Sequence, residues 1–337
     1  MRIGRVWHDA DVEESEAPAL RFEVAVVGTI NLDRTVRVPH LPASGETVVG
    51  DAVTTALGGK GANQAVAAAR QGVRTALIAC VGDDRDGAAL LGYLADEPNL
   101  DARGVRRAAG PTGAAFATVD ESGANTVVSA RGINRALDDA HVDRHGRAIA
   151  DASVLLVQLG VSHDAIRAAL EIARSVGTIT VLDPSPADEV ADDLLRLVDI
   201  CTPNETEAER LTGIAVDDLD RAYQAAEALV ARGCALVVVT LGARGAVCAS
   251  AGASACLFVP PFAVDAVDPT GAGDAFCGVL AAALARGAPI GDALTRAAAA
   301  GALAATRIGA APSLPTQAEV DALVERGGRG GRGGRGV

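Results

Sequence analysis

Aromatic residues are scarce in this chain of 337 residues, where they make up 2% of the sequence. Proteins that bind single-stranded nucleic acids stack bases on aromatic side chains, so no stacking platform is expected. Basic residues are also in the minority, with 30 Lys and Arg against 43 Asp and Glu and a formal net charge of −13. That balance argues against nucleic acids or anionic membranes as partners of the protein body. It still allows an anionic ligand, because a local pocket can carry the opposite charge.

Long apolar runs are missing as well. No uncharged run reaches the ~18 residues of a membrane-spanning helix, so no membrane is expected as a partner. The N-terminus carries Glu13, Glu14 and Glu16 where a secretory leader would be apolar. No two cysteines have Cys-x-x-Cys spacing, which indicates reduced, buried thiols in a cytoplasmic protein. The cysteines are Cys80, Cys201, Cys234, Cys248, Cys256 and Cys277.

The two ends of the chain lack a pattern that could bury a core. Residues 1–20 are expected to be a disordered acidic extension, and residues 326–337 a disordered Gly/Arg tail. The arginines of the tail leave RNA binding open beside the alternative of a solvated tail. The folded domain is therefore expected over residues 21–325.

Between these ends, short β-branched runs alternate with helical stretches. Strands separated by helices predict βαβ units and an α/β fold with a mainly parallel sheet. The expected strands are residues 24–30, 75–82, 153–159, 178–183, 199–203 and 235–242. The clearest expected helices are residues 61–72, 272–286 and 290–306.

Two stretches break this alternation. Residues 34–56 alternate around a Pro/Gly-rich turn, and residues 112–130 show two strands around the sequence DESGAN. Together they predict a small sheet beside the main one. Such a sheet often covers a site at the carboxyl ends of parallel strands, so these stretches are expected to form a lid.

Polar residues follow the first expected strand. Asn31 and Asp33 are two residues apart, so in an extended chain both side chains project to the same side. An amide beside a carboxylate can bind hydroxyl groups, which need both a donor and an acceptor. An ordinary turn is the alternative. The Gly-rich stretch 57–64, LGGKGANQ, permits close backbone approach but lacks the spacing of a P-loop, and a plain turn before a helix stays open.

Two later motifs follow other expected strands. In TPNETEAE, residues 202–209, Asn204 and Glu207 lie one helical turn apart and can face one site. Glu207 could hold Mg²⁺ through water, while a helix-capping pair is the alternative. TLGARG, residues 240–245, is a strand that runs into a Gly turn and carries little signal alone.

The sequence DPTGAGDAF, residues 268–276, leads into a late helix. The N–H groups of Gly271, Ala272 and Gly273 at its start can bind an anion. Asp274 adds a negative charge at the same place. Both features fit phosphoryl transfer, because the carboxylate can take a proton from an attacking alcohol while the N–H groups stabilise the phosphoryl charge. A Rossmann turn is the competing interpretation, but the third glycine is absent.

These stretches, in this order, resemble the ribokinase-like (PfkB-type) sugar kinases over about residues 23–316. GGKGANQAVAAAR and DPTGAGDAFCG are similar to the family's two signatures, with support from VGDD, TPNETEA, TLGARGA and TRIGAAPSLP. The resemblance implies a central, mainly parallel β-sheet flanked by helices, with a small β-sheet lid. It also implies an ATP-dependent kinase that phosphorylates a primary hydroxyl of a pentose, D-ribose first, to the 5-phosphate.

The resemblance also implies roles for the motif residues. Asp274 is the base, and the anion hole consists of Gly271, Ala272 and Gly273. The sugar site is lined by Asn31, Asp33, Gly59, Lys60, Gly61 and Asn63. Glu207 helps to place Mg²⁺, and ATP lies along Asn204, Thr240, Gly242, Gly245 and Gly273. A monovalent cation, K⁺, is held mostly by carbonyl oxygens of Asp268, Thr270, Ala304, Arg307, Gly309 and Ser313. The lid implies a homodimer contact.

Two residues depart from the family pattern. Family members that act on ribose usually read Q-L-E after the central strand, where this chain has Gln158, Leu159 and Gly160. Losing a charge-assisted hydrogen bond to the sugar costs about 1.5–3 kcal/mol, enough to change sugar preference. Pro269 stands where Thr is commoner, which removes an N–H from the cation loop but keeps its carbonyls. A nucleoside kinase such as one for adenosine, a non-catalytic sugar or nucleotide sensor, and a dinucleotide oxidoreductase remain as alternatives.

Overall fold

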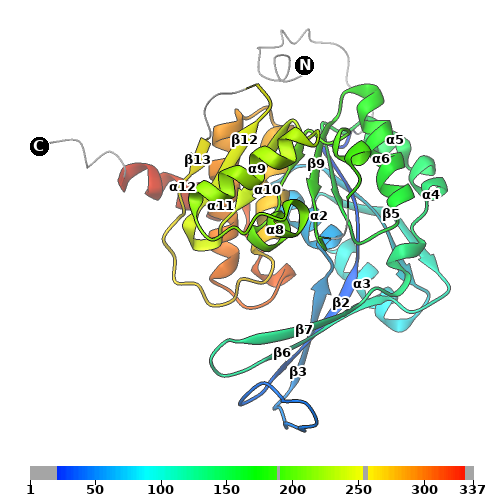
Figure 1. Cartoon of the computed structure of the whole chain (residues 1–337). Coiled ribbons are helices and arrows are strands. Elements are labelled where there is room, and N and C mark those ends of the chain that lie inside the picture. The colour runs from blue at the N-terminus through cyan, green and yellow to red at the C-terminus, as the bar shows by residue number, and fades with distance from the viewer. Residues whose placement is uncertain (1–20, 188–189, 253–256, 331–337) are drawn as a thin grey trace, which may run out of the picture.

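A nine-stranded main sheet forms the centre of the computed structural model, which describes residues 21–187, 190–252 and 257–330 (Figure 1). Its strand order is β13-β12-β11-β10-β9-β8-β1-β4-β5. From β5 across to β11 the strands run parallel. At one edge, β12 pairs antiparallel with β11, and β13 pairs antiparallel with β12. The mainly parallel sheet is therefore confirmed. The strands are β1 Val24–Val27, β4 Thr75–Gly82, β5 Leu100–Ala108, β8 Val154–Gln158, β9 Ile179–Asp183, β10 Ile200–Cys201, β11 Leu236–Thr240, β12 Ala246–Ser250 and β13 Leu257–Val259.

Helices cover both faces of this sheet because its strands are apolar on both sides. In β1, Val24 and Val26 belong to the core shared with α2, α10 and α11, whereas Ala25 and Val27 belong to the core shared with α6 and α9. The helices are α2 Lys60–Ala69, α3 Arg85–Ala95, α4 Asp139–Arg144, α5 Gly146–Ala150, α6 His163–Val176, α7 Asp192–Leu195, α8 Glu205–Thr212, α9 Leu219–Ala231, α10 Ala272–Ala285, α11 Ile290–Ala305 and α12 Gln317–Gly330. Short 3₁₀ turns are η1 Gly132–Ala136, η2 Gly242–Arg244 and η3 Ala311–Ser313.

The lid is a separate four-stranded sheet that projects from the body (Figure 1). Its order is β3-β2-β6-β7, with strands β2 Asn31–Arg37, β3 Val53–Gly58, β6 Gly113–Val119 and β7 Asn125–Ala130. Two antiparallel hairpins, β2–β3 and β6–β7, join through a parallel β2–β6 pair. The small second sheet is confirmed, and it begins earlier than expected, so that Asn31 and Asp33 belong to it.

Some element boundaries differ from the sequence expectations. The first strand ends at Val27 instead of residue 30, because the chain then crosses into the lid sheet and the Ile30 N–H bonds to Asn134 Oδ1 at 2.9 Å. α12 continues through residues 326–330, at the start of the expected Gly/Arg tail. The expected acidic extension, residues 1–20, and residues 331–337 lie outside the described residues.

The described cysteines form no disulfide and are buried: Cys80, Cys201, Cys234, Cys248 and Cys277. This agrees with the expected buried thiols, and Cys256 lies outside the described residues. Within those residues, no helix combines the length and apolar character needed to cross a membrane.

Candidate active site

The N-terminus of α10 forms one wall of the site. Gly271 caps the helix with φ +82°, a conformation that favours glycine, and the first helical bond runs from the Ala275 N–H to the Gly271 carbonyl at 2.8 Å. The Gly273 and Asp274 N–H groups therefore precede any acceptor within the helix. The Ala272 N–H donates instead to the Pro269 carbonyl at 3.1 Å. A Cβ added at Gly273 would meet nothing within 4 Å, so the space beside these donors is open.

Asp274 lies in the first turn of α10 and is 6% exposed. Its Oδ2 accepts from Asn63 Nδ2 at 2.8 Å, and its Oδ1 accepts from Gln64 Nε2 at 3.2 Å. Lys60 Nζ is 3.9 Å from the same Oδ1. Two residues of the Gly-rich signature on α2 thus hold the carboxylate of the second signature. This contact joins stretches that are 211 residues apart in the chain.

A second buried carboxylate, Asp183, lies beside this contact at the end of β9. Lys60 Nζ donates to its Oδ2 at 3.1 Å. Burial lowers the pKa of Lys60, but the nearby carboxylates outweigh burial and raise it. Burial raises the pKa of Asp183, and the Lys60 ammonium opposes that rise. No sequence motif pointed to Asp183, whose one signal is its place at the carboxyl end of a buried strand.

The lid brings two polar side chains to the same region. Asn31 and Asp33 alternate with Leu32 along β2, so they share one face of the strand, as their spacing predicts. Burial, and then repulsion from Asp274, raises the pKa of Asp33 to about 7. Asn31 Oδ1 accepts from Asn134 Nδ2 at 2.9 Å, and the sequence carried no signal for that buried partner.

Glycines let α2 approach this part of the lid closely. A Cβ at Gly59, where φ is +86°, would be 2.7 Å from the Asn31 nitrogen. A Cβ at Gly61 would be 2.6 Å from the Gly28 carbonyl carbon. The Gly-rich stretch therefore packs backbone against backbone at the end of β1.

The expected nucleotide residues meet at the carboxyl ends of β10 and β11. Asn204 pairs with Thr240 in an isolated parallel bridge, and the Gly242–Arg244 turn follows directly. Asn204 and Glu207 form a capping box at the start of α8, with two reciprocal bonds of 2.9 Å. In the described structure these two side chains therefore cap the helix, as the alternative interpretation of the motif expects. Glu207 is also 9% exposed, and its charge raises the pKa of Lys60.

The expected cation residues lie on the segment before α10 and on the end of α11 with the turns that follow it, and Asp268 ties the two together. Its Oδ1 accepts from the Thr270 N–H at 2.9 Å, and its Oδ2 accepts from the Gly309 N–H at 2.8 Å. Burial opposes its ionisation, but these N–H groups outweigh burial and lower the pKa of Asp268. The Ala304 carbonyl accepts from the Arg307 N–H at 3.1 Å, and the buried Ser313 hydroxyl donates to the Ala310 carbonyl at 2.7 Å.

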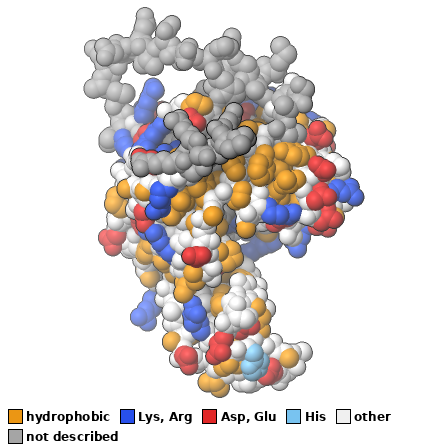
Figure 2. Space-filling view, turned by 90° about the vertical axis from the view of Figure 1, so that its left-hand side faces the viewer, with side chains coloured by type: hydrophobic (Ala, Val, Ile, Leu, Met, Phe, Trp, Pro, Cys, Tyr) orange, Lys and Arg blue, Asp and Glu red, His pale blue; other side chains and the backbone are white. Residues whose placement is uncertain are grey.

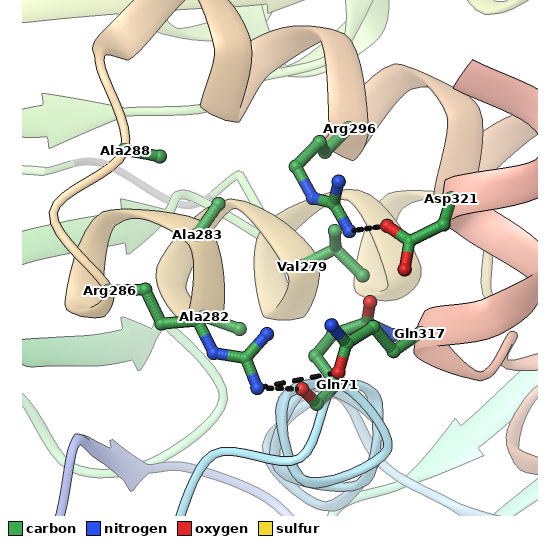
Figure 3. Close-up of a pocket in the computed structure, with 9 residues that line it drawn as sticks. All are labelled: Gln71, Val279, Ala282, Ala283, Arg286, Ala288, Arg296, Gln317 and Asp321. Carbon is green, nitrogen blue, oxygen red and sulfur yellow. Dashed lines mark hydrogen bonds and ion pairs between the residues drawn. The ribbon is translucent and has the colours of Figure 1, made fainter. Parts of the chain in front are cut away.

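A cavity of about 260 Å³ lies at the opposite end of α10 (Figure 3). Twelve residues of helix place Arg286 about 18 Å from Asp274. Arg286 donates to the Gln71 carbonyl, and Arg296 pairs with Asp321 at 2.5 Å. None of the residues that line this cavity belongs to the carboxylate cluster, so the two are distinct. In the part of the chain that the structure describes, no group of three or more His, Cys, Asp or Glu side chains could hold a metal ion.

The sequence of residues 21–317 matches the family model described as pfkB family carbohydrate kinase. The chain belongs to this family. It is 39% identical to a ribokinase of Haemophilus influenzae over 301 residues, which is 89% of this chain and 97% of that protein. The structure of Arabidopsis thaliana ribokinase with ribose and ATP matches with a TM-score of 0.84 and 30% identity, covering 91% of this chain and 99% of that one. A putative ribokinase II from E. coli, solved with ATP and Mg²⁺, matches with a TM-score of 0.74 and 25% identity, covering 90% and 99%.

In this pfkB-family chain the two signatures contribute side chains to one cluster. Lys60 and Asn63 come from the first signature, Asp274 comes from the second, and Asp33 enters from the lid. The cluster lies at the carboxyl ends of the parallel strands, where open α/β sheets bind ligands. The main residues that sequence reasoning missed are Asp183, Gln64 and Asn134, whose partners are far away in the chain.

Proposed function

We propose that this chain transfers the γ-phosphoryl group of ATP to a primary hydroxyl of a pentose, D-ribose first, giving the 5-phosphate. The observation that carries the proposal is the place of Asp274, held by Asn63 beside the open N-terminus of α10. The ribokinase relatives support the reaction, and the Arabidopsis structure with ribose and ATP supports both substrates.

Each group then has a chemical task. Asp274 accepts the proton of the attacking hydroxyl, because a buried carboxylate without its own proton is a base at neutral pH. The Gly273 N–H and its neighbours Gly271 and Ala272 stabilise the charge that spreads over the transferred phosphoryl oxygens. Ala272 must first give up its bond to Pro269. The sugar hydroxyls bind to Asn31, Asp33, Gly59, Lys60, Gly61 and Asn63.

Magnesium fits this site as a partner of ATP. Mg²⁺ keeps several waters and usually takes one or two carboxylates together with substrate phosphates, so a small donor set is sufficient. Glu207 offers a carboxylate near Lys60, beside the expected ATP residues Asn204, Thr240, Gly242 and Gly245. We assign Glu207 to Mg²⁺ through water, where the ion would neutralise charge on the phosphates.

A monovalent cation also belongs to the proposal. Asp268 accepts hydrogen bonds from the Thr270 and Gly309 N–H groups, and this link between the two segments supports a cation site formed by carbonyls of Thr270, Ala304 and Gly309. Carbonyl oxygens suit a large, weakly hydrated cation. K⁺ held there, with Arg307 and Ser313 completing the set, would add positive potential near the anion hole.

The lid supports a homodimer. Residues paired across strands share a face, so the β2–β6–β7 register places Arg34, Phe116 and Val128 on the face that lacks Asn31 and Asp33. Phe116 is 48% exposed and Val128 is 70% exposed. Figure 2 shows the lid as an arm that stands out from the body. An apolar face on a projecting arm fits a second copy of the same face.

The direct test measures ADP release with D-ribose, 2-deoxyribose, fructose and adenosine, each with Mg²⁺ and K⁺. We expect the highest kcat/KM with D-ribose. Asp274→Asn keeps the shape and loses the base, so it should lower kcat by about 10³-fold while nucleotide binding persists. The highest kcat/KM with adenosine would indicate a nucleoside kinase, and sugar binding without ADP release would indicate a sensor.

A further inference from the structure

Gln64 links the two buried carboxylates of the site. Its side chain lies on α2 and is fully buried. Its Nε2 donates to Asp183 Oδ2 at 2.7 Å and to Asp274 Oδ1 at 3.2 Å. A primary amide has two N–H hydrogens, and here each carboxylate receives one. None of the steps of the proposed phosphoryl transfer uses this amide.

Gln158 fixes the orientation of that amide. It ends β8, is fully buried, and its Nε2 donates to Gln64 Oε1 at 2.7 Å. A reversed Gln64 amide would point its oxygen at two carboxylate oxygens and its N–H groups at another donor. The observed chain, from Gln158 through Gln64 to the carboxylates, is therefore the orientation in which every contact has a donor and an acceptor.

This orientation carries a cost to stability. Gln158 Oε1 is buried and has no hydrogen-bond partner among the described residues. It lies against Gly28, where an added Cβ would be 1.8 Å away. Buried unpaired acceptors are uncommon because they lose their hydrogen bonds to water. A chain that keeps one beside its active site indicates a functional requirement for the orientation.

The charges around Asp274 show what the amide contributes. Lys60 on α2 is nearer to Asp183, at 3.1 Å, than to Asp274, at 3.9 Å. Asp33 on β2 and Asp183 on β9 carry the same charge as Asp274. Cys277, three residues later on α10, is a thiol whose pKa is raised by burial. The negative charge of Glu207 on α8 raises the pKa of Lys60 and that of Asp183. Without a donor between them, two neighbouring carboxylates favour a shared proton, which would block a base.

We propose that Gln64 is a positioning residue, whose amide bridges Asp183 and Asp274 and holds Asp274 ionised and aimed at the acceptor hydroxyl, with Gln158 fixing the amide. The inference rests on the proposed function in one respect, namely that Asp274 is the base. A neutral donor suits the task, because it orients the carboxylate without the tight ion pair that would reduce its basicity.

The test replaces the amide with a side chain of similar shape and no donor. Gln64→Met should lower kcat by about 10- to 100-fold, because a misaimed base costs rate. The KM values for sugar and ATP should change little. The acid limb of the kcat–pH profile should move to higher pH, since losing a donor disfavours the ionised carboxylate. Gln158→Met should show the same changes at smaller size, and the double variant should be no slower than Gln64→Met alone.

Gln71→Met is the matched control. Gln71 is also a buried glutamine with an unpaired oxygen, but it follows the C-terminal end of α2, and its Nε2 donates to the Pro315 carbonyl at 3.1 Å. It should lower stability without moving the pH profile. A Gln64→Met enzyme with the wild-type kcat and pH profile would overturn the proposal, and so would a loss confined to thermal stability. If Gln64→Met does not fold, Gln158→Met decides by the same criteria.

A titration without substrate separates this inference from the proposed function. Carboxyl ¹³C signals of labelled aspartate follow ionisation directly, and Asp274→Asn identifies the Asp274 signal. In Gln64→Met that signal should titrate at higher pH than in the wild type. If the wild type releases no ADP with any acceptor, the proposed function fails, while an unmoved signal in this titration overturns the role of Gln64.

Discussion

At the scale of single residues, Asp33 is a carboxyl group whose ionisation falls near neutral pH. Burial and Asp274 raise its pKa to about 7. As the proposed acceptor for sugar hydroxyls it must be ionised, so sugar affinity should fall as pH drops below about 7. Asp33→Asn should remove this pH dependence. Equilibrium dialysis of labelled ribose between pH 5.5 and 8.5 measures it, and a wild-type affinity that is flat over this range would contradict the assignment.

The same shift predicts a change in stability. The folded pKa of Asp33 lies above the unfolded value of 3.8, so between these values the folded state holds a proton that the unfolded state has released. The contribution of Asp33 to stability is therefore lost as pH rises through about 7. Asp33→Asn should raise Tm at pH 8 by several °C, because the ionised Asp33 destabilises the folded state there by up to about 4 kcal/mol. At pH 4 the two melting curves should nearly coincide.

Gly160 stands where family members that act on ribose usually carry Glu. A Cβ at Gly160 would be 2.4 Å from Thr29 Cγ2, so the threonine methyl occupies the space that a side chain would need. Gly160→Glu alone should therefore lower Tm. Gly160→Glu with Thr29→Ser removes the methyl and should recover Tm. It should also lower the KM for ribose by about tenfold or more, the equivalent of one charged hydrogen bond. Thr29→Ser alone is the control, and a double variant with unchanged KM would contradict the role.

At the scale of elements, the two segments joined by Asp268 are expected to bind K⁺. Activity should be higher in KCl than in NaCl or choline chloride at equal ionic strength. Asp268→Ala should remove this difference, because the segments lose both N–H bonds that align their carbonyls, and should cost about 2 kcal/mol in urea unfolding. Asp265→Ala, an exposed carboxylate on the same segment, is the control. Equal activity in all three salts would exclude a cation requirement.

At the scale of the whole molecule, the lid is expected to join two copies. Light scattering should give twice the 33.8 kDa chain mass. Val128→Asp should shift the mass toward the monomer, because it buries a charge in the apolar contact. Val127→Asp is a matched control, since adjacent residues of a strand point to opposite faces. A wild-type monomer, or an equal effect of both variants, would contradict the proposed face.

Much of this molecule follows from the sequence by itself. Apolar runs such as residues 75–82 and 153–159 form strands because both of their faces are buried. The local sequence DPTGAGDAF is sufficient to predict the Gly-rich start of α10. The lid followed from alternation and turn residues. These features depend on neighbours in the chain, which the sequence lists directly.

The tertiary structure alone decided which side chains meet. Gln64 reaches Asp183 across 119 residues and Asp274 across 210, and the Thr29 methyl fills the space beside Gly160. Such contacts depend on the packing of distant elements and on rotamer choice, and no local pattern records either. The sequence determined the chemical groups of the site, and packing determined their partners.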